Sequence, residues 1–95
     1  MIYYHGTSIP NLKIILPPIE TRVLREDFRR GYRDCVFITP LRKSAEMYAK
    51  KCAAKFGGQP VVYEVEPVNE YEINTSQYIC DRAIVLNSYP VKSGS

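Results

Sequence analysis

The clearest hydrophobic pattern in the chain lies between residues 39 and 58. Apolar side chains recur there three or four residues apart, the spacing of one face of an α-helix. Thr39 has a hydroxyl that can cap the first turn, and Pro40 suits the first helical position. Gly57 and Gly58 are expected to end the helix. The apolar positions are Leu41, Ala45, Tyr48, Ala49, Cys52, Ala53 and Phe56.

Short β-rich segments surround this helix. Residues 20–30 are different, since their pattern predicts a short amphipathic helix or a structured basic loop. One central helix among mostly extended segments indicates the α+β class and not alternating βαβ units. The expected strands are residues 2–5, 12–16, 35–39, 61–66, 71–73 and 83–87, with Gly6, the Pro17-Pro18 pair and Pro67 ending the first, second and fourth.

The chain is long enough for one small domain. It has 95 residues, and a domain of that size buries only about 60–65% of the surface that its unfolded chain exposes. We find no internal repeat, linker or low-complexity block. The sequence therefore predicts a single domain over residues 1–90 with a thin core, followed by a polar tail at residues 91–95.

Composition excludes several classes of protein. The apolar share is 45% and the charged share 24%, which excludes global disorder and collagen-like repeats. No apolar run approaches the ~20 residues of a membrane span, and the first residues lack the basic start of a secretory signal, so we expect a cytoplasmic protein without membrane contact. Three widely spaced cysteines and one histidine predict neither a disulfide framework nor a metal site.

Charge is unevenly distributed along the chain. The net charge is +3, but residues 22–55 hold ten basic and four acidic side chains, whereas residues 61–81 hold five acidic and no basic ones. A basic side favours partners that carry phosphate. The alternative is two solvated faces that balance each other.

Two sets of residues are candidates for chemistry. His5 stands at the expected end of the first strand and is followed by Gly6, so an imidazole lies beside backbone that a ligand can approach closely. The alternative is a turn that holds a histidine by chance. Glutamates 64/66 and 70/72 form two pairs on shared strand faces, which is more typical of a solvated face than of a glycosidase dyad. Phosphate-binding glycine loops and a serine nucleophile elbow are absent from the sequence.

Three motifs, in order and spacing, resemble the ADP-ribosyltransferase family. The chain looks most like the small rifampin-type ADP-ribosyltransferases and, more distantly, like the catalytic domains of poly-ADP-ribose polymerases. This resemblance covers about residues 1–67 and implies a small split antiparallel β-sheet with one principal helix and a cleft that binds NAD as a substrate. The motifs are YYHGTS at 3–8, VFITP at 36–40 with Ala45, Tyr48 and Ala49 after it, and VYEVEP at 62–67.

The resemblance also implies roles for individual residues. The backbone of Gly6 would bind the nicotinamide carboxamide, and His5 a ribose hydroxyl of the adenosine half. Phe37, where the family usually has tyrosine, and Tyr48 would form aromatic walls around the nicotinamide ring. From the pattern alone, both aromatic residues are more typical of a core than of a ligand-binding wall. The expected NAD-binding set is His5, Gly6, Thr7, Phe37, Thr39 and Tyr48.

An acid is the remaining catalytic requirement that the resemblance implies. A carboxylate on the ribose 2′-hydroxyl would stabilise the positive charge that develops as nicotinamide leaves. Asp81 is the first candidate and Glu72 the second, and with His5 they form the expected catalytic set. The spacing of the rifampin type leads instead to residues 72–74, and to Asn74 by direct count.

We therefore expect an NAD-dependent mono-ADP-ribosyltransferase that modifies an unidentified protein, nucleic acid or small molecule. The main alternative is a catalytically degenerate module that binds a nucleotide or a host protein and acts as an inhibitor or adaptor. Removal of a 2′-phosphate from RNA and plain nucleic-acid binding are further alternatives. In each case phosphates could meet the basic segment formed by Arg22, Arg25, Arg29, Arg30 and Arg33.

Overall fold

The computed structural model describes residues 2–17 and 35–92 as an α+β domain. One sheet has the strand order β1-β4-β7-β2 and the other β3-β6-β5, and every pairing within them is antiparallel. The strands are β1 (Tyr3–Thr7), β2 (Ile14–Ile15), β3 (Val36–Ile38), β4 (Val61–Val68), β5 (Tyr71–Asn74), β6 (Gln77–Cys80) and β7 (Arg82–Pro90), and the helix is α2 (Arg42–Phe56).

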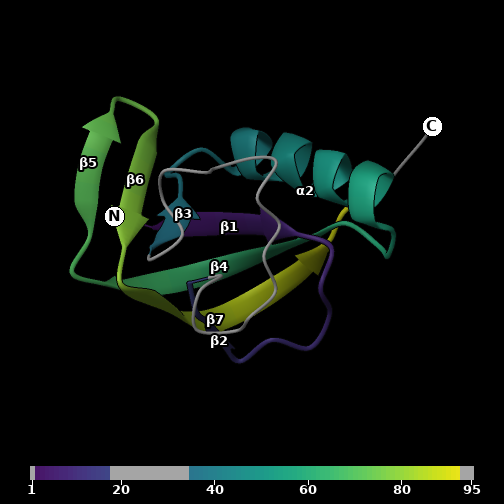
Figure 1. The fold of residues 1–95 in the computed structure, drawn as a ribbon, viewed down its shortest axis with the longest axis horizontal. Helices are drawn as coiled ribbons and strands as arrows, with labels where there is room; N and C mark the ends of the chain where they lie inside the picture. The colour runs from purple at the N-terminus through teal and green to yellow at the C-terminus, as the bar shows by residue number, and fades with distance from the viewer. Residues whose placement is uncertain (1, 18–34, 93–95) are drawn as a thin grey trace.

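The helix packs on one face of the four-stranded sheet, over β1 and β4. Figure 1 shows α2 lying along β1, with the β5–β6 hairpin standing at the far end of the molecule. The contact depends on small side chains, because Ala45 and Ala49 of α2 are buried against Val62 of β4. The predicted apolar stripe therefore faces the sheet in its middle, whereas Leu41 at its start is 50% exposed.

The start of α2 differs from the prediction. The helix begins at Arg42, with Leu41 as its N-cap residue and without a side-chain cap. The Thr39 hydroxyl does accept a hydrogen bond from a backbone N–H, that of Leu41 at 3.1 Å, but this contact lies ahead of the helix. Pro40 therefore precedes α2 and does not occupy its first position. Gly57 ends the helix with φ 84°, as its sequence position predicts.

The main core lies between the two sheets, around Tyr63. This side chain is 1% exposed, and its hydroxyl donates to the carbonyl oxygen of Ile9 at 2.6 Å and accepts from the N–H of Leu12 at 3.3 Å. Its buried polar atom is therefore satisfied. The rest of this core consists of Tyr3, Ile15, Val36, Ile38, Val65, Cys80 and Ala83.

Several strand predictions are wrong in extent. Strand β4 runs through Pro67 to Val68, because β1 ends its pairing with β4 at Val65, and Pro67 pairs only with β7 beyond that point. Strand β2 is confined to two residues, and β7 is longer than residues 83–87. Strand β6 is absent from the prediction. The expected helix or loop at 20–30, its arginines and the last residues of the tail lie outside the described residues.

Candidate functional site

A pocket of about 110 Å³ opens where β1 and β3 diverge beneath the first half of α2. Five residues of the expected NAD-binding set line it, namely His5, Gly6, Phe37, Thr39 and Tyr48. Thr7 does not line it, because this residue is buried farther along β1 opposite Val61. The other lining residues are Tyr4, Ile38, Ser44, Ala45, Ser76 and Gln77.

The backbone of β1 faces this pocket with one donor and one acceptor. The N–H of Tyr4 donates to the carbonyl of Thr39 at 2.7 Å, and the N–H of Thr39 donates to the carbonyl of Tyr4 at 2.9 Å. Backbone groups of alternate residues in a strand point to the same edge. The N–H and C=O of Gly6 therefore point to the edge on which β3 has already diverged, and not toward β4.

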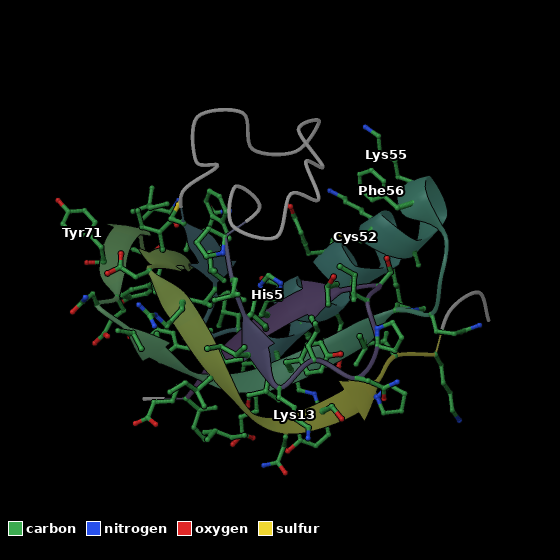
Figure 2. The ribbon with its side chains drawn as sticks, turned by 60° about the horizontal axis from the view of Figure 1, so that its bottom comes forward. His5, Lys13, Cys52, Lys55, Phe56 and Tyr71 are labelled. Carbon is green, nitrogen blue, oxygen red and sulfur yellow. The ribbon has the colours of Figure 1, made fainter. Side chains whose placement is uncertain are left out.

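The imidazole of His5 has a defined tautomer. Its Nδ1 lies 2.7 Å from the carbonyl oxygen of Phe37, and a carbonyl can only accept, so Nδ1 carries the proton. Burial lowers the pKa of His5, although the Phe37 carbonyl opposes this shift. The ring is therefore neutral near pH 7, and its Nε2 is a hydrogen-bond acceptor. Figure 2 shows His5 near the centre of the molecule, beside β1.

Two aromatic residues from different elements line the pocket. Phe37 comes from β3 and Tyr48 from the second turn of α2, and both are half-buried. Aromatic rings in the wall of a pocket can stack on a flat ligand, so this pair suits a small planar group. The pocket, at about 110 Å³, is somewhat smaller than the apolar cavity of roughly 150 Å³ that accepts benzene, so its size is that of part of a ligand and not of a whole dinucleotide.

The turn between β5 and β6 forms the remaining wall. Ser76 and Gln77 line the pocket, and the Thr39 hydroxyl donates to the carbonyl of Ser76 at 2.6 Å. Asn74 holds the turn in shape, because its Oδ1 accepts from the N–H of Ser76 and its Nδ2 donates to Oε1 of Gln77, both at 3.0 Å. Sequence reasoning missed this wall. Asn, Thr and Ser between two β-rich runs are the turn signal that would have indicated it.

The two expected acids lie away from the pocket. Asp81 is exposed between β6 and β7, where its carboxylate accepts from Asn69 at 2.8 Å. Glu72 is exposed on the edge strand β5, opposite Tyr78. Neither side chain is among the lining residues, and no lining residue in the described ranges is a carboxylate. A catalytic role for either acid stays a prediction.

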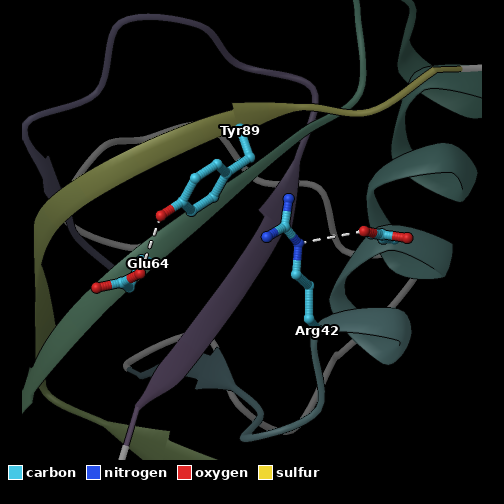
Figure 3. Close-up of polar contacts among 4 residues, drawn as sticks. Arg42, Glu64 and Tyr89 are labelled. Atoms are coloured by element: carbon cyan, nitrogen blue, oxygen red, sulfur yellow. Dashed lines mark hydrogen bonds and ion pairs between the residues drawn. The ribbon is translucent and has the colours of Figure 1, made fainter.

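Two further carboxylates, those of Glu46 and Glu64, belong to a separate cluster of polar contacts (Figure 3). The guanidinium of Arg42 lies 4.3 Å from the ring centre of Tyr89, and its Nε donates to Glu46 at 3.3 Å. The Tyr89 hydroxyl donates to Glu64 at 3.1 Å, and this bond is the main cause of the raised pKa of Tyr89. Glu64 pairs with Tyr4 across β1 and β4, so the cluster adjoins the pocket through Tyr4.

Metal chemistry has no candidate centre in residues 2–17 and 35–92. No group of three or more histidine, cysteine, aspartate or glutamate side chains in these ranges is placed to hold a metal ion. None of the helices among the described residues is long and apolar enough to cross a membrane.

The pocket offers a backbone donor and acceptor, a neutral imidazole, two aromatic rings and several hydroxyl and amide groups. This combination suits a small planar polar group.

Comparisons with known proteins add no relative. No family model matches the chain, and no curated protein or solved structure is significantly similar to it. The pocket is therefore the feature of the molecule that bears on its function.

Proposed function

We propose that the pocket binds the nicotinamide ring of NAD and that the protein is an NAD-dependent mono-ADP-ribosyltransferase with an ADP-ribosyltransferase-like fold. The observation that carries the proposal is the position of the Gly6 backbone in the same pocket as the Phe37 and Tyr48 rings. A primary carboxamide on an aromatic ring needs a donor, an acceptor and a flat apolar surface. These are the three things that this set of residues offers.

The geometry supports recognition of the carboxamide in particular. Its oxygen would accept from the N–H of Gly6, and its NH₂ would donate to the C=O of the same residue. The Nε2 of His5 would accept from a hydroxyl of the ligand, which suits a ribose. A pocket of about 110 Å³ holds one ring, so the rest of the dinucleotide would extend outside it.

Transfer of ADP-ribose would begin with cleavage of the bond between the nicotinamide nitrogen and the ribose carbon. The bonding electron pair leaves with nicotinamide, the ribose carbon becomes positively charged, and a nucleophile of the acceptor then bonds to it and loses its proton. Residues near this carbon would have to stabilise the charge. Asp81 is the first proposed acid and Glu72 the second, and the ribose would have to extend out of the pocket to reach either, because neither lines it.

A second candidate is a module that binds NAD or a related nucleotide without transfer. One observation favours it. Among the described residues, the pocket wall formed by the β5–β6 turn offers the side-chain amide of Gln77 and the hydroxyl of Ser76, and no acid. Uncharged amides bind sugars and phosphates but cannot neutralise a developing positive charge.

Calorimetry with nicotinamide and NAD tests binding. We expect Tyr48→Ala to weaken nicotinamide binding about tenfold, because it removes one ring from the pocket. Met47→Ala is the matched control, since Met47 is the preceding residue on α2 and is 62% exposed. Wild-type protein that binds neither compound would refute the first candidate, and it would refute the second for NAD.

Labelled NAD then separates the two candidates. Incubation with NAD that carries the label in its adenylate part, with and without cell extract, gives labelled acceptor or free ADP-ribose if the protein is a transferase. Binding without either product supports the module. Loss of product in Glu72→Gln or Asp81→Asn would identify the acid.

A further inference from the structure

One isolated antiparallel bridge joins β1 to Thr39, the residue that follows β3. Tyr4 and Thr39 exchange both backbone hydrogen bonds, at 2.7 and 2.9 Å, as a hydrogen-bonded pair in an antiparallel sheet does. In the same register, the next such pair would be Gly6 with Phe37. The N–H of Gly6 would then donate to the carbonyl of Phe37. The structure has only the isolated Tyr4–Thr39 bridge between these strands.

The carbonyl of Phe37 has a different donor. The Nδ1–H of His5 lies 2.7 Å from this oxygen, so a side chain of β1 occupies the acceptor that the backbone of β1 would otherwise use. This hydrogen bond is partly buried. The imidazole gives the Phe37 carbonyl a donor without bringing the two strands together.

We infer that His5 is a positioning residue that keeps the sheets apart at the pocket and leaves the backbone of Gly6 available to a ligand. Its imidazole replaces the N–H of Gly6 as the donor to Phe37. The identity of the ligand rests on the proposed function, because the Gly6 backbone is the group that would bind the carboxamide. The role of His5 in keeping the strands apart does not depend on any ligand.

Removal of the imidazole has a defined structural consequence. In His5→Ala the carbonyl of Phe37 loses the imidazole as a donor, and the nearest backbone replacement in the register is the N–H of Gly6. The ladder between β1 and β3 would then extend by one pair and close the open edge. His5→Asn is the conservative variant, because Nδ2 of asparagine is the same number of bonds from the backbone as Nδ1 of histidine.

Amide hydrogen exchange measured by NMR on the full chain tests this inference without any ligand. We expect the Gly6 amide to exchange about tenfold more slowly in His5→Ala than in the wild type, as one backbone hydrogen bond is gained. His5→Asn should restore wild-type exchange. The amide of Tyr4, bonded to Thr39, is the internal control that shows that the sheet is intact. Unchanged Gly6 exchange in a folded His5→Ala protein, or an Asn variant that behaves like the Ala variant, would overturn the inference.

Two measurements on the wild type keep the test decisive if His5→Ala does not fold. A long-range proton–nitrogen spectrum must show Nδ1 protonated and Nε2 unprotonated near pH 7, and the opposite tautomer refutes the inference. The Gly6 amide must also exchange faster than those of His5 and Thr7, whose backbone groups face β4 by the alternation along β1. Neither measurement involves nicotinamide. Failure to bind NAD would therefore refute the proposed function but not the role of His5 between β1 and β3.

Discussion

The carbonyl group of Ala45 occupies the place where a side chain of Gly6 would begin. A Cβ built on Gly6 meets the backbone of α2 at Ala45 and Ala49, with the Ala49 nitrogen at 2.9 Å. The helix therefore packs on β1 at backbone distance. Sequence reasoning explained this glycine by the approach of a ligand, and the structure adds a second reason that holds without one.

Gly6→Ala should therefore be strongly destabilising. The added Cβ would clash with backbone atoms, so α2 must move away from β1, and overpacking of this kind costs about 1–3 kcal/mol. Chemical denaturation measures the loss in the free energy of unfolding. Gly57→Ala is the control, since its added Cβ meets nothing within 4 Å and only its φ of 84° is unfavourable. The contact is less important than we argue if Gly6→Ala is the milder of the two.

Stability should fall as the pH is lowered from 7.5 to 5.5, because of His5. Burial lowers the pKa of His5 from its ordinary 6.5, and the hydrogen bond to Phe37 only partly opposes this. Between the folded pKa and 6.5 the unfolded chain binds a proton that the folded chain does not, so the free energy of unfolding decreases as pH falls. His5 is the one histidine in the sequence, so His5→Asn should flatten the profile in urea titrations. An identical slope in both proteins would contradict the assignment.

The regular part of the fold could be predicted from the sequence, because it depends on local patterns. The stripe from Ala45 to Cys52 has helical period, and Val61, Val62 and Tyr63 form a continuous apolar run of residues that favour strands. Strand β6 could not be predicted so easily, because it is half-buried and depends on pairing with β3 and β5. Such pairings between distant segments leave little trace in a local window.

The candidate site, like the fold, could be predicted only in part from the sequence. His5, Gly6, Phe37, Thr39 and Tyr48 were grouped by motif resemblance, and the pocket brings them together. Ser76 and Gln77 reach the pocket only because the β5–β6 hairpin folds back on β3 and Thr39 bonds to its turn. That relation joins residues 37 positions apart in the sequence. Spacing could not reveal it, nor that Asp81 lies at the opposite end of β6 from Gln77.

Cys80 should be almost unreactive in the folded protein. Burial raises the pKa of its thiol from 9.0 to about 12, with nearby Cys35 contributing to the shift, so the thiolate is about 10³-fold rarer than in an ordinary cysteine. Alkylation with iodoacetamide at pH 8, followed by peptide mass spectrometry, measures this. The urea-unfolded chain supplies the control rate. Native Cys80 that is labelled as fast as the unfolded chain would refute the burial argument.

The exchange of one amide for an acid tests whether the pocket lacks only a charge. Asn74→Asp keeps an oxygen that can accept from the N–H of Ser76 and loses the donor to Gln77, so the turn should persist. A carboxylate beside the Gln77 wall would stabilise positive charge on a ribose bound there. If the wild type binds NAD without turnover, we expect this variant to hydrolyse NAD on the order of 10²-fold above the wild-type background.

Asn69→Asp, which places a new acid beside Asp81 and away from the pocket, should leave hydrolysis unchanged. Equal rates in both variants would show that charge at the β5–β6 turn is not what limits transfer. A wild type with turnover of its own should instead lose it in Glu72→Gln or Asp81→Asn, and gain little from Asn74→Asp.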